Sequence, residues 1–426
     1  KGSGGNSKTP VQSVSDSLSA AVGSSAQERL TKAAALLKTW EIDAAEVTLE
    51  EEIGDGGQAV VMRGQWKGME VAAKQPRRRG SVRGSAAAAV QMETFIRREV
   101  RALSRVRHPN VVKLYGSCLS PTPMVLMAYA PHGTLQDAVD DLRFQTNEDV
   151  VRLLAGIARG MEAVHAHNII HLDLKPENVL IGPLDTPWVT DFGLSTSSNQ
   201  NSMSVSSVGG RGTMAFKAPD LFANPPVVLP AADVYAFAVL SWIVSTKERP
   251  YKSQLSVDTS LPIAVPQGLR PELPNGDDWR ETTMPKLAKL IEACWAGEHG
   301  SRPAFGGDGG IVETLSKLEA SVTKSTDETA QLSMVARLIA DEAEVEETEE
   351  YIAKINKALG DADEAQAREL AEERDGVLVS CNLARQNAAA TKRVISADGG
   401  GDALLEDVLA MLSSLQKDMS VAKEER

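Results

Sequence analysis

Four polar side chains lie in one short stretch of the chain and could together transfer a phosphoryl group. Asp173 offers a carboxylate that can orient an attacking hydroxyl, and Lys175 places a positive charge two positions later. Asn178 and Asp191 carry the oxygen atoms that Mg²⁺ prefers as ligands. Each residue alone is a common turn residue, but the combination at this spacing indicates phosphoryl transfer.

A glycine-rich segment further upstream suits a phosphate-bearing ligand. The pattern from Ile53 to Val61 predicts two strands joined by a turn, where backbone N–H groups can approach phosphates without obstruction by Cβ atoms. Glycine clusters alone usually mark hairpins, but here an apolar strand ending in Lys74 follows, and Glu99 is a natural partner for its ammonium group. We expect the nucleotide to contact Ile53, Gly54, Gly56, Val61, Ala72 and Lys74.

The elements that must position these residues follow from hydrophobic periodicity. Apolar runs predict strands over residues 111–119 and 124–130, and a helix carrying Glu99 is predicted over residues 95–114, closing at His108-Pro109-Asn110. Further helices are predicted over residues 135–141, 147–167 and 234–244. The sequence therefore predicts a small strand-rich part followed by a larger helical part.

These motifs resemble the eukaryotic protein kinase family over about residues 45–316. The strongest matches are the stretch from Ile170 to Gly193, the pair Lys74 and Glu99, and Ala218-Pro219-Asp220. Within the family, the chain looks like the tyrosine-kinase-like group of serine/threonine kinases. This finer likeness rests on Trp40–Asp43, Asp233–Phe237, Gly268–Pro271, Cys294-Trp295, Arg302-Pro303 and the Lys175-Pro176 pair.

The resemblance implies an α+β, bilobal fold, in which a small antiparallel sheet lobe contains one key helix and a larger lobe is mainly helical. It implies ATP and Mg²⁺ as cofactors and serine or threonine hydroxyls of proteins as acceptors. The implied catalytic residues are Asp173 as the base, Lys175, Asn178, Lys74 and Glu99, and the implied metal ligands are Asn178 and Asp191. Met127 would guard the back of the nucleotide pocket, and backbone groups of Ala128 and Ala130 would bond to adenine.

The chain departs from the family pattern at three supporting positions. Ala59 replaces the third glycine of the hairpin, and Asp220 replaces a glutamate that is expected to pair with Arg302. Leu172 replaces an arginine that, in the family, neutralises a phosphate on the activation segment. We therefore predict that phosphorylation within residues 195–207 is not the main on-switch, and that control comes through the basic insertion, the tail or dimerisation.

Several supporting contacts can also be predicted. Thr213 is expected to contact Asp173 and Lys175. Asp233 starts an apolar helix and should accept hydrogen bonds from catalytic-loop N–H groups, since a buried, unpaired carboxylate is costly. The following histidines are expected to serve turns or packing rather than a metal: His108, His165, His167 and His171.

Composition narrows the remaining functional classes. The net charge is −13, but residues 321–426 carry 23 acidic and 12 basic residues, so the catalytic part is nearly neutral and nucleic-acid binding is not supported. Three widely spaced cysteines favour a reducing, cytoplasmic location over a disulfide framework or zinc site. No apolar run predicts a membrane span or a signal peptide. The chain begins at Lys1 rather than at methionine, which leaves an upstream targeting segment open.

The segments around the kinase-like part have their own patterns. Residues 1–39 read as a low-complexity leader with a short helix, and residues 325–426 as an acidic helical tail. An intramolecular bundle, and oligomerisation or partner docking through these C-terminal helices, both remain open, whereas a coiled coil is only weakly supported. In the basic insertion, Ser81 is either part of a solvated loop or a phosphorylation site for a basophilic kinase.

Three functional classes are compatible with these motifs. An active serine/threonine kinase is favoured because Lys74, Glu99, Asp173, Asn178 and Asp191 are all present. The alternative is a catalytically weak, kinase-like scaffold that acts through its helical tail. A kinase of small molecules is disfavoured by Ala218-Pro219 and Thr213, which are typical of peptide substrates.

Overall fold

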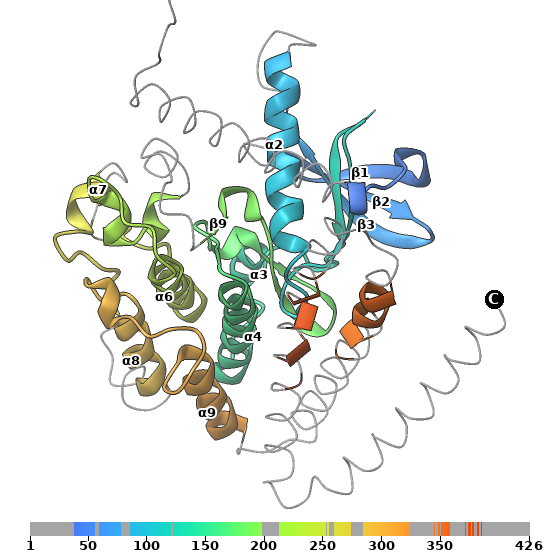
Figure 1. Ribbon diagram of the computed structural model, residues 1–426. Helices are drawn as coiled ribbons and strands as arrows, with labels where there is room; N and C mark the ends of the chain where they lie inside the picture. Colours follow the sequence, from blue (N-terminus) through green and yellow to red (C-terminus); the bar gives the residue numbers. More distant parts are fainter. Residues whose placement is uncertain are drawn as a thin grey trace, which may run out of the picture. The chain divides into compact units, whose positions relative to one another are not determined.

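The structure is a computed structural model (Figure 1). It describes residues 38–55, 59–77, 86–120, 122–197, 213–252, 254, 260–273 and 284–323, together with parts of 345–385. The chain divides into two compact units. Unit 1 comprises Lys1–Arg101 and Leu114–Met127, and unit 2 comprises Ala102–Lys113 and Ala128–Arg426. We describe each unit by itself.

Unit 1 is built on a five-stranded sheet in the order β1-β2-β3-β5-β4. The strands are β1 (Val47–Asp55), β2 (Ala59–Trp66), β3 (Met69–Pro76), β4 (Leu114–Cys118) and β5 (Met124–Ala128). Antiparallel pairing places Val61 opposite both Gly54 and Lys74, so Gly54 and Lys74 lie on the two strands that flank β2. The predicted small antiparallel sheet is confirmed.

One face of this sheet forms the core of unit 1. Val71, Ala73, Cys118, Met124 and Leu126 are buried together, and partly buried side chains of β1 and β2 pack against them. Alternation along the central strands accounts for this arrangement, since neighbouring residues of a strand point to opposite faces.

Helix α2 (Ala86–Leu103) differs from its predicted bounds of residues 95–114. It begins earlier because Ala86–Ala89 continue the helix on its N-terminal side, and alanine has the highest helix propensity. It ends earlier because Pro109 disfavours helical geometry at His108, while the N–H of Val112 bonds to Val189 O at 3.0 Å. This second contact also shortens the predicted strand 111–119 to β4.

Unit 2 is mainly helical, with α3 (Leu135–Asp140), α4 (Asn147–Ala166), α6 (Ala231–Thr246), α7 (Leu261–Ala264), α8 (Pro285–Cys294) and α9 (Ile311–Thr323). The predicted helices 135–141, 147–167 and 234–244 are therefore present with small differences at their ends. Thr134 and Thr146 cap α3 and α4 by accepting bonds from the N–H groups of Asp137 and Asp149. Helix α6 is apolar on all sides, and most of its residues are buried.

Two short hairpin-like sheets in unit 2 carry the candidate catalytic residues. Strand β6 (Ile169–Ile170) pairs with β9 (Thr196–Ser197), and β7 (Val179–Ile181) pairs with β8 (Pro187–Val189). The loop between β6 and β7 contains Asp173, Lys175 and Asn178, while Asp191 follows β8. The two sheets thus bring residues separated in sequence to neighbouring loops.

Described parts of the tail are helical and contact the rest of unit 2. Residues 351–357 form helix, and Thr348, Ile355, Val377 and Cys381 are buried. The guanidinium carbon of Arg107 lies 3.9 Å from the centre of the Tyr351 ring. The Arg107–Tyr351 contact joins this part of the tail to the segment before β4 within unit 2.

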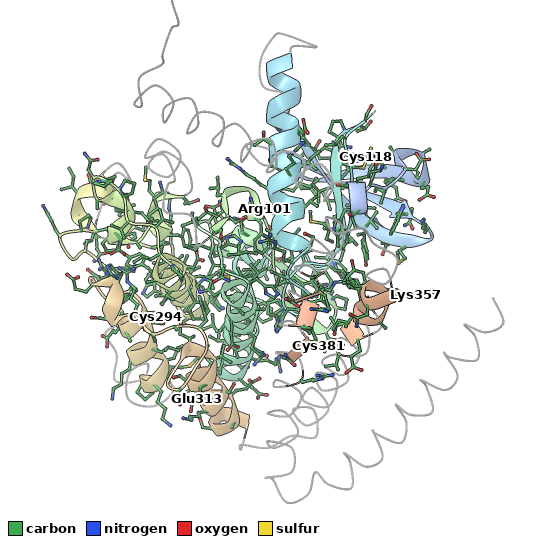
Figure 2. All side chains as sticks on the ribbon, in the orientation of Figure 1. Arg101, Cys118, Cys294, Glu313, Lys357 and Cys381 are labelled. Carbon is green, nitrogen blue, oxygen red and sulfur yellow. The ribbon has the colours of Figure 1, made fainter. Side chains whose placement is uncertain are left out.

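The cysteines lie on separate elements and none is in a disulfide (Figure 2). Cys118, Cys294 and Cys381 are all buried, and burial raises the pKa of Cys294 to about 12. Within the described residues, no helix combines the length and apolar character that a membrane span requires.

Some predictions concern residues outside the described ranges. These are Gly56, Ser81, the helix within the leader, most of the serine-rich segment 195–207, and the part of the predicted helical tail beyond residue 385.

Candidate active site

Lys74 and Glu99 form a buried ion pair in unit 1, between strand β3 and helix α2. The Glu99 side chain is 0% exposed and the Lys74 side chain is 9% exposed. The Lys74 Nζ atom also lies 5.2 Å from the centre of the Phe95 ring. Because the partners sit on different elements, the position of the ammonium group depends on how the helix packs.

At the hairpin, Gly54 is not required by packing within unit 1. A Cβ atom added to Gly54 would meet Val61 at 3.6 Å, which is an ordinary contact, so packing within unit 1 does not demand glycine there. Ile53 is 42% exposed although it is a large apolar residue, and Ala72 is buried. Approach of a ligand to the backbone explains a glycine at this position better than internal packing does.

The catalytic loop holds Asp173 by direct contacts with two of the predicted residues. Asn178 Nδ2 donates to the Asp173 backbone oxygen at 2.7 Å and to Asp173 Oδ2 at 2.9 Å. Lys175 Nζ lies 3.1 Å from Asp173 Oδ2 and donates to Thr213 Oγ1 at 3.2 Å. The predicted contact of Thr213 with Lys175 is confirmed, and a carboxylate, a cation and an amide are gathered at one point.

Asp233 fixes the backbone of this loop from helix α6. Its Oδ2 accepts from the N–H of His171 at 2.8 Å, and its Oδ1 accepts from the N–H of Leu172 at 2.8 Å. His165 Nε2 lies 2.8 Å from the same carboxylate. Leu172 adopts φ +67°, a conformation that side-chain-bearing residues rarely take unless their surroundings enforce it. The predicted role of Asp233 is confirmed.

His171 connects the catalytic loop to the turn that carries Asp191. Its Nε2 bonds to the Thr190 oxygen at 2.9 Å, and its ring lies 4.8 Å from the ring of Phe192. Asp191 has φ +63° and accepts from the N–H of Gly193 at 3.3 Å. The packing role predicted for His171 is confirmed.

Asp220 and Arg302 form the predicted ion pair, at 2.7 Å. Arg302 also donates to the backbone oxygens of Ala296, Ala231 and Gly297, and its side chain is fully buried. The shorter acid at position 220 therefore still reaches its partner without an intervening water.

Ala128 ends strand β5, and its backbone N–H is engaged within unit 2. The N–H of Ala128 donates to Lys113 O at 2.9 Å, because the chain continues the pairing of β5 with the residues preceding β4. Any bond from Ala128 to a base would use its carbonyl oxygen instead. Met127 is buried and pairs with Leu114.

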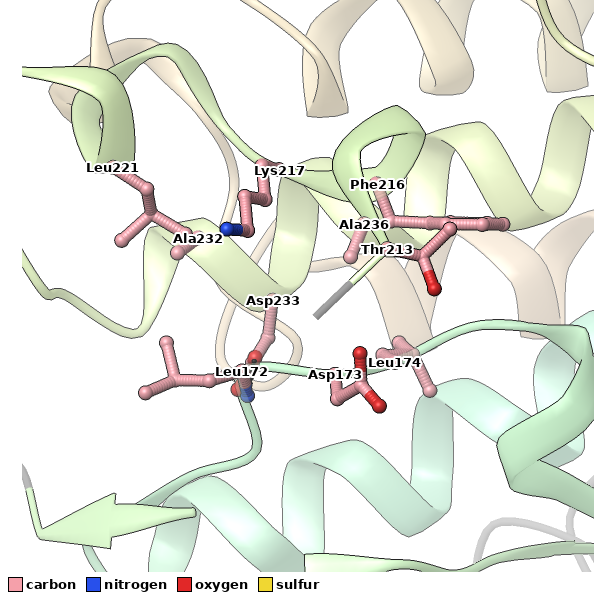
Figure 3. A pocket seen from close by; sticks show the side chains of 10 residues that line it. All are labelled: Leu172, Asp173, Leu174, Thr213, Phe216, Lys217, Leu221, Ala232, Asp233 and Ala236. Carbon is pink, nitrogen blue, oxygen red and sulfur yellow. Dashed lines mark hydrogen bonds between the residues drawn. The ribbon is translucent and has the colours of Figure 1, made fainter. Parts of the chain in front are cut away.

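A small pocket lies beside Asp173 in unit 2 (Figure 3). It is lined by Leu172, Asp173, Leu174, Thr213, Phe216, Lys217, Leu221, Ala232, Asp233 and Ala236. Sequence reasoning missed Lys217, whose signal was a lysine within the otherwise apolar run Met214-Ala-Phe-Lys-Ala218. Burial lowers the pKa of Lys217, and Asp173 partly opposes this shift.

The described residues contain no group of three or more His, Cys, Asp or Glu side chains that could hold a metal by themselves. A cation at Asn178 and Asp191 would need further oxygen ligands from phosphate or water. Mg²⁺ usually binds in this way, with few protein ligands. The amide nitrogen of Asn178 is engaged with Asp173, so its oxygen is the atom available to a cation.

Comparison with known protein families gives a match that covers the sheet of unit 1 and most of the described helices of unit 2. A profile described as protein tyrosine and serine/threonine kinase matches residues 47–307. That span is more than half of the 426 residues.

Several curated proteins are similar to the chain. A probable serine/threonine-protein kinase of Dictyostelium discoideum is 32% identical over 62% of this chain and 27% of its own length. Mitogen-activated protein kinase kinase kinase 13-B of Xenopus laevis is 33% identical over 63% of this chain and 25% of its own. The serine/threonine-protein kinase STY17 of Arabidopsis thaliana is 28% identical over 66% of this chain and 46% of its own. The chain thus spans less than half of the length of these relatives.

Proposed function

The chain belongs to the protein tyrosine and serine/threonine kinase family, and from this premise we propose that it is an active serine/threonine protein kinase. The observation that carries the proposal is the arrangement around Asp173, where Asn178 and Lys175 hold the carboxylate and Asp233 fixes the loop backbone. Two of the relatives, from Dictyostelium discoideum and Arabidopsis thaliana, are named as serine/threonine-protein kinases, which supports this assignment.

ATP and Mg²⁺ are the cofactors that the family uses, and the residues present fit them. We assign Asn178 and Asp191 as metal ligands, because both carry oxygen atoms and lie on loops that His171 ties together. The phosphates would be held by Lys74, which Glu99 orients, and by backbone groups of the hairpin at Gly54. When bound, the metal neutralises charge on the phosphates.

In this mechanism Asp173 accepts the proton of the attacking hydroxyl. Its Oδ2 is held by Asn178 and lies next to Lys175, so the carboxylate is oriented before substrate binds. Lys175 places its positive charge beside the reacting groups, and its bond to Thr213 joins the catalytic loop to the end of the activation segment. Asp173 and Lys175 are therefore held in place for these roles before the reaction begins.

The acceptors that we propose are serine and threonine hydroxyls of proteins. Lys175 follows the base at the spacing typical of serine/threonine kinases, and the relatives with printed specificities are kinases of this class. We further propose a signalling role in a reducing, intracellular compartment, which the buried free thiols of Cys118, Cys294 and Cys381 support. Docking of partners or of a second copy through the C-terminal helices is also a proposal.

The test is transfer of labelled γ-phosphate from ATP·Mg²⁺ to a generic protein substrate, followed by phosphoamino-acid analysis. We expect label on serine and threonine with the wild-type chain, and a loss of about 100-fold or more with Asp173→Asn. Equal, background incorporation by both proteins would favour the scaffold that acts through its tail. Label on tyrosine alone would contradict the proposed specificity.

A further inference from the structure

Lys217 is a buried cation in the pocket beside the candidate catalytic base. It lies between two short 3-10 helices, Met214–Phe216 and Pro219–Phe222, and is 4% exposed. Figure 3 shows its side chain on the activation-segment side of the pocket, with the nitrogen ending next to Ala232 and above Asp233. A lysine is rarely buried to this degree unless its charge is compensated.

The other charged groups that line the pocket are both acidic. Asp173 and Asp233 come from the catalytic loop and helix α6, and Lys217 is the one cation among the ten lining residues. Lys175 and His165 contact these two carboxylates from outside the lining. The pocket therefore places a single ammonium group opposite the carboxylate that the proposed mechanism uses as a base.

The wall of the pocket across from Lys217 contains Leu172 and supplies no positive charge. Leu172 lines it at the position where the family pattern has arginine, and leucine brings no charge. The backbone of Leu172 is nevertheless held in its φ +67° conformation by Asp233. The loop geometry is thus retained while the positive charge from this position is absent.

We propose that Lys217 is a positioning residue for phosphoryl transfer, which supplies from the activation segment the positive charge that Leu172 does not provide. Its ammonium group holds residues 213–222 under the catalytic loop and stabilises the placement of Asp173. This inference rests on the proposed kinase function. It also gives the activation segment a fixed charge of its own, so that order at its C-terminal end does not require a phosphate.

The experiment compares Lys217→Met and Lys217→Arg with the wild-type chain by steady-state kinetics. Methionine keeps the length of the side chain and removes the charge, whereas arginine keeps the charge. We expect Lys217→Met to lower kcat about 10-fold or more, with the KM for ATP changed by less than about twofold, and Lys217→Arg to retain most of kcat. Lys289→Met, at an exposed position of α8, is the matched control and should leave kcat unchanged.

Thermal melting separates positioning from a structural role. Asp173 keeps Asn178 and Lys175 as partners, and Asp233 keeps His165, when Lys217 is replaced, so we expect Lys217→Met to melt within about 4 °C of the wild type. The double variant Leu172→Arg/Lys217→Met returns a cation to the pocket. We expect its kcat to be at least about fivefold higher than that of Lys217→Met alone. Lower kcat without lower stability is the signature of the proposed role.

The outcomes are distinguishable from failure of the proposed function. Absence of transfer by the wild-type chain would overturn the kinase proposal and with it this inference. Wild-type activity together with an unchanged kcat in Lys217→Met would overturn this inference alone. A Lys217→Met protein that melts well below the wild type, with Lys217→Arg equally impaired, would also overturn it by showing a structural role.

Discussion

Lys74 in unit 1 and Asp173 in unit 2 are both held by buried polar contacts, but the means differ. Lys74 is positioned by the carboxylate of Glu99, which sits on a separate helix. Asp173 lies in a loop whose backbone is fixed by Asp233, whose side chain is held by Asn178, and whose neighbour His171 bonds to Thr190. The position of Lys74 depends on the packing of one helix, whereas the position of Asp173 is fixed by several independent hydrogen bonds.

This difference indicates that the Lys74–Glu99 pair, rather than the loop around Asp173, can change between two conformations. A side-chain pair between two elements breaks when one element shifts, and the ammonium group then loses its orientation. A loop held by several bonds to one buried carboxylate keeps its geometry, even with the left-handed conformation at Leu172. We therefore expect regulation to act on Glu99 and its helix, and the loop around Asp173 to stay constant.

Removal of the Asp233 carboxylate should have the largest effect. Asp233→Ala leaves the buried N–H groups of His171 and Leu172 without an acceptor, which we expect to cost about 2–6 kcal/mol of unfolding free energy. Urea unfolding of the full chain, monitored by tryptophan fluorescence, measures this cost. Asp233→Asn retains one acceptor and should lose less; equal losses would show that the carboxylate does not hold the loop through both oxygens.

Breaking the Lys74–Glu99 pair should have the next largest effect. Glu99→Gln leaves a buried ammonium group without its counter-charge, at an expected cost of about 3 kcal/mol. The double replacement Lys74→Met/Glu99→Leu should return to within about 1 kcal/mol of the wild type while phosphoryl transfer stays lost. If the double variant were as unstable as Glu99→Gln, the pair would be a structural element and the contrast with the loop would fail.

Loss of the contact between the tail and unit 2 should have a smaller effect. Tyr351→Ala removes the ring that lies 3.9 Å from Arg107, and we expect a loss of about 0.5–1 kcal/mol. Hydrogen exchange of residues 102–113 should increase in the variant, with Tyr351→Phe as a control that keeps the ring. Unchanged exchange in both variants would show that the tail does not support this segment.

The smallest effect is expected at Glu162 on α4 and depends on pH. Burial raises the pKa of Glu162 above 4.5, and Arg159 partly opposes the shift. The folded state then binds more protons than the unfolded state between 4.5 and the raised pKa, so stability falls as pH rises through this window. Glu162→Gln should therefore melt slightly above the wild type at neutral pH and show no gain well below pH 4.5. A gain of equal size at both pH values would exclude ionisation as its cause.

Much of the fold could be predicted from periodicity and motif spacing. The strands carrying the glycine-rich hairpin and Lys74, the apolar stripe of α4 and the buried helix after Asp233 followed directly from the sequence. The N-terminal end of α2 was missed because its alanines give high helix propensity but no apolar stripe. Its C-terminal end was overextended because the pairing of Val112 with Val189 is a tertiary contact that local pattern does not contain.

Contacts in the candidate site could be predicted where the residue types determine the partner. They could not be predicted where tertiary packing determines it. The partners of Asp220 and Thr213 followed from the resemblance to the kinase family, and those of Asp233 also from the cost of leaving a buried carboxylate unpaired. The bond from Ala128 N–H to Lys113 was missed because it depends on how the strands register. Lys217 was missed because a lysine within an apolar run signals burial but does not show that it lines the same pocket as Asp173.

The most direct test of the account is single-turnover transfer of γ-phosphate from ATP·Mg²⁺ by wild type and Asp173→Asn, with nucleotide binding measured on the same samples. The account predicts that the variant binds ATP·Mg²⁺ within about threefold of the wild type, since Asp173 is not among the assigned nucleotide or metal ligands, while the transfer rate falls at least about 100-fold. Equal transfer rates in the two proteins would contradict the assignment of Asp173 as the base.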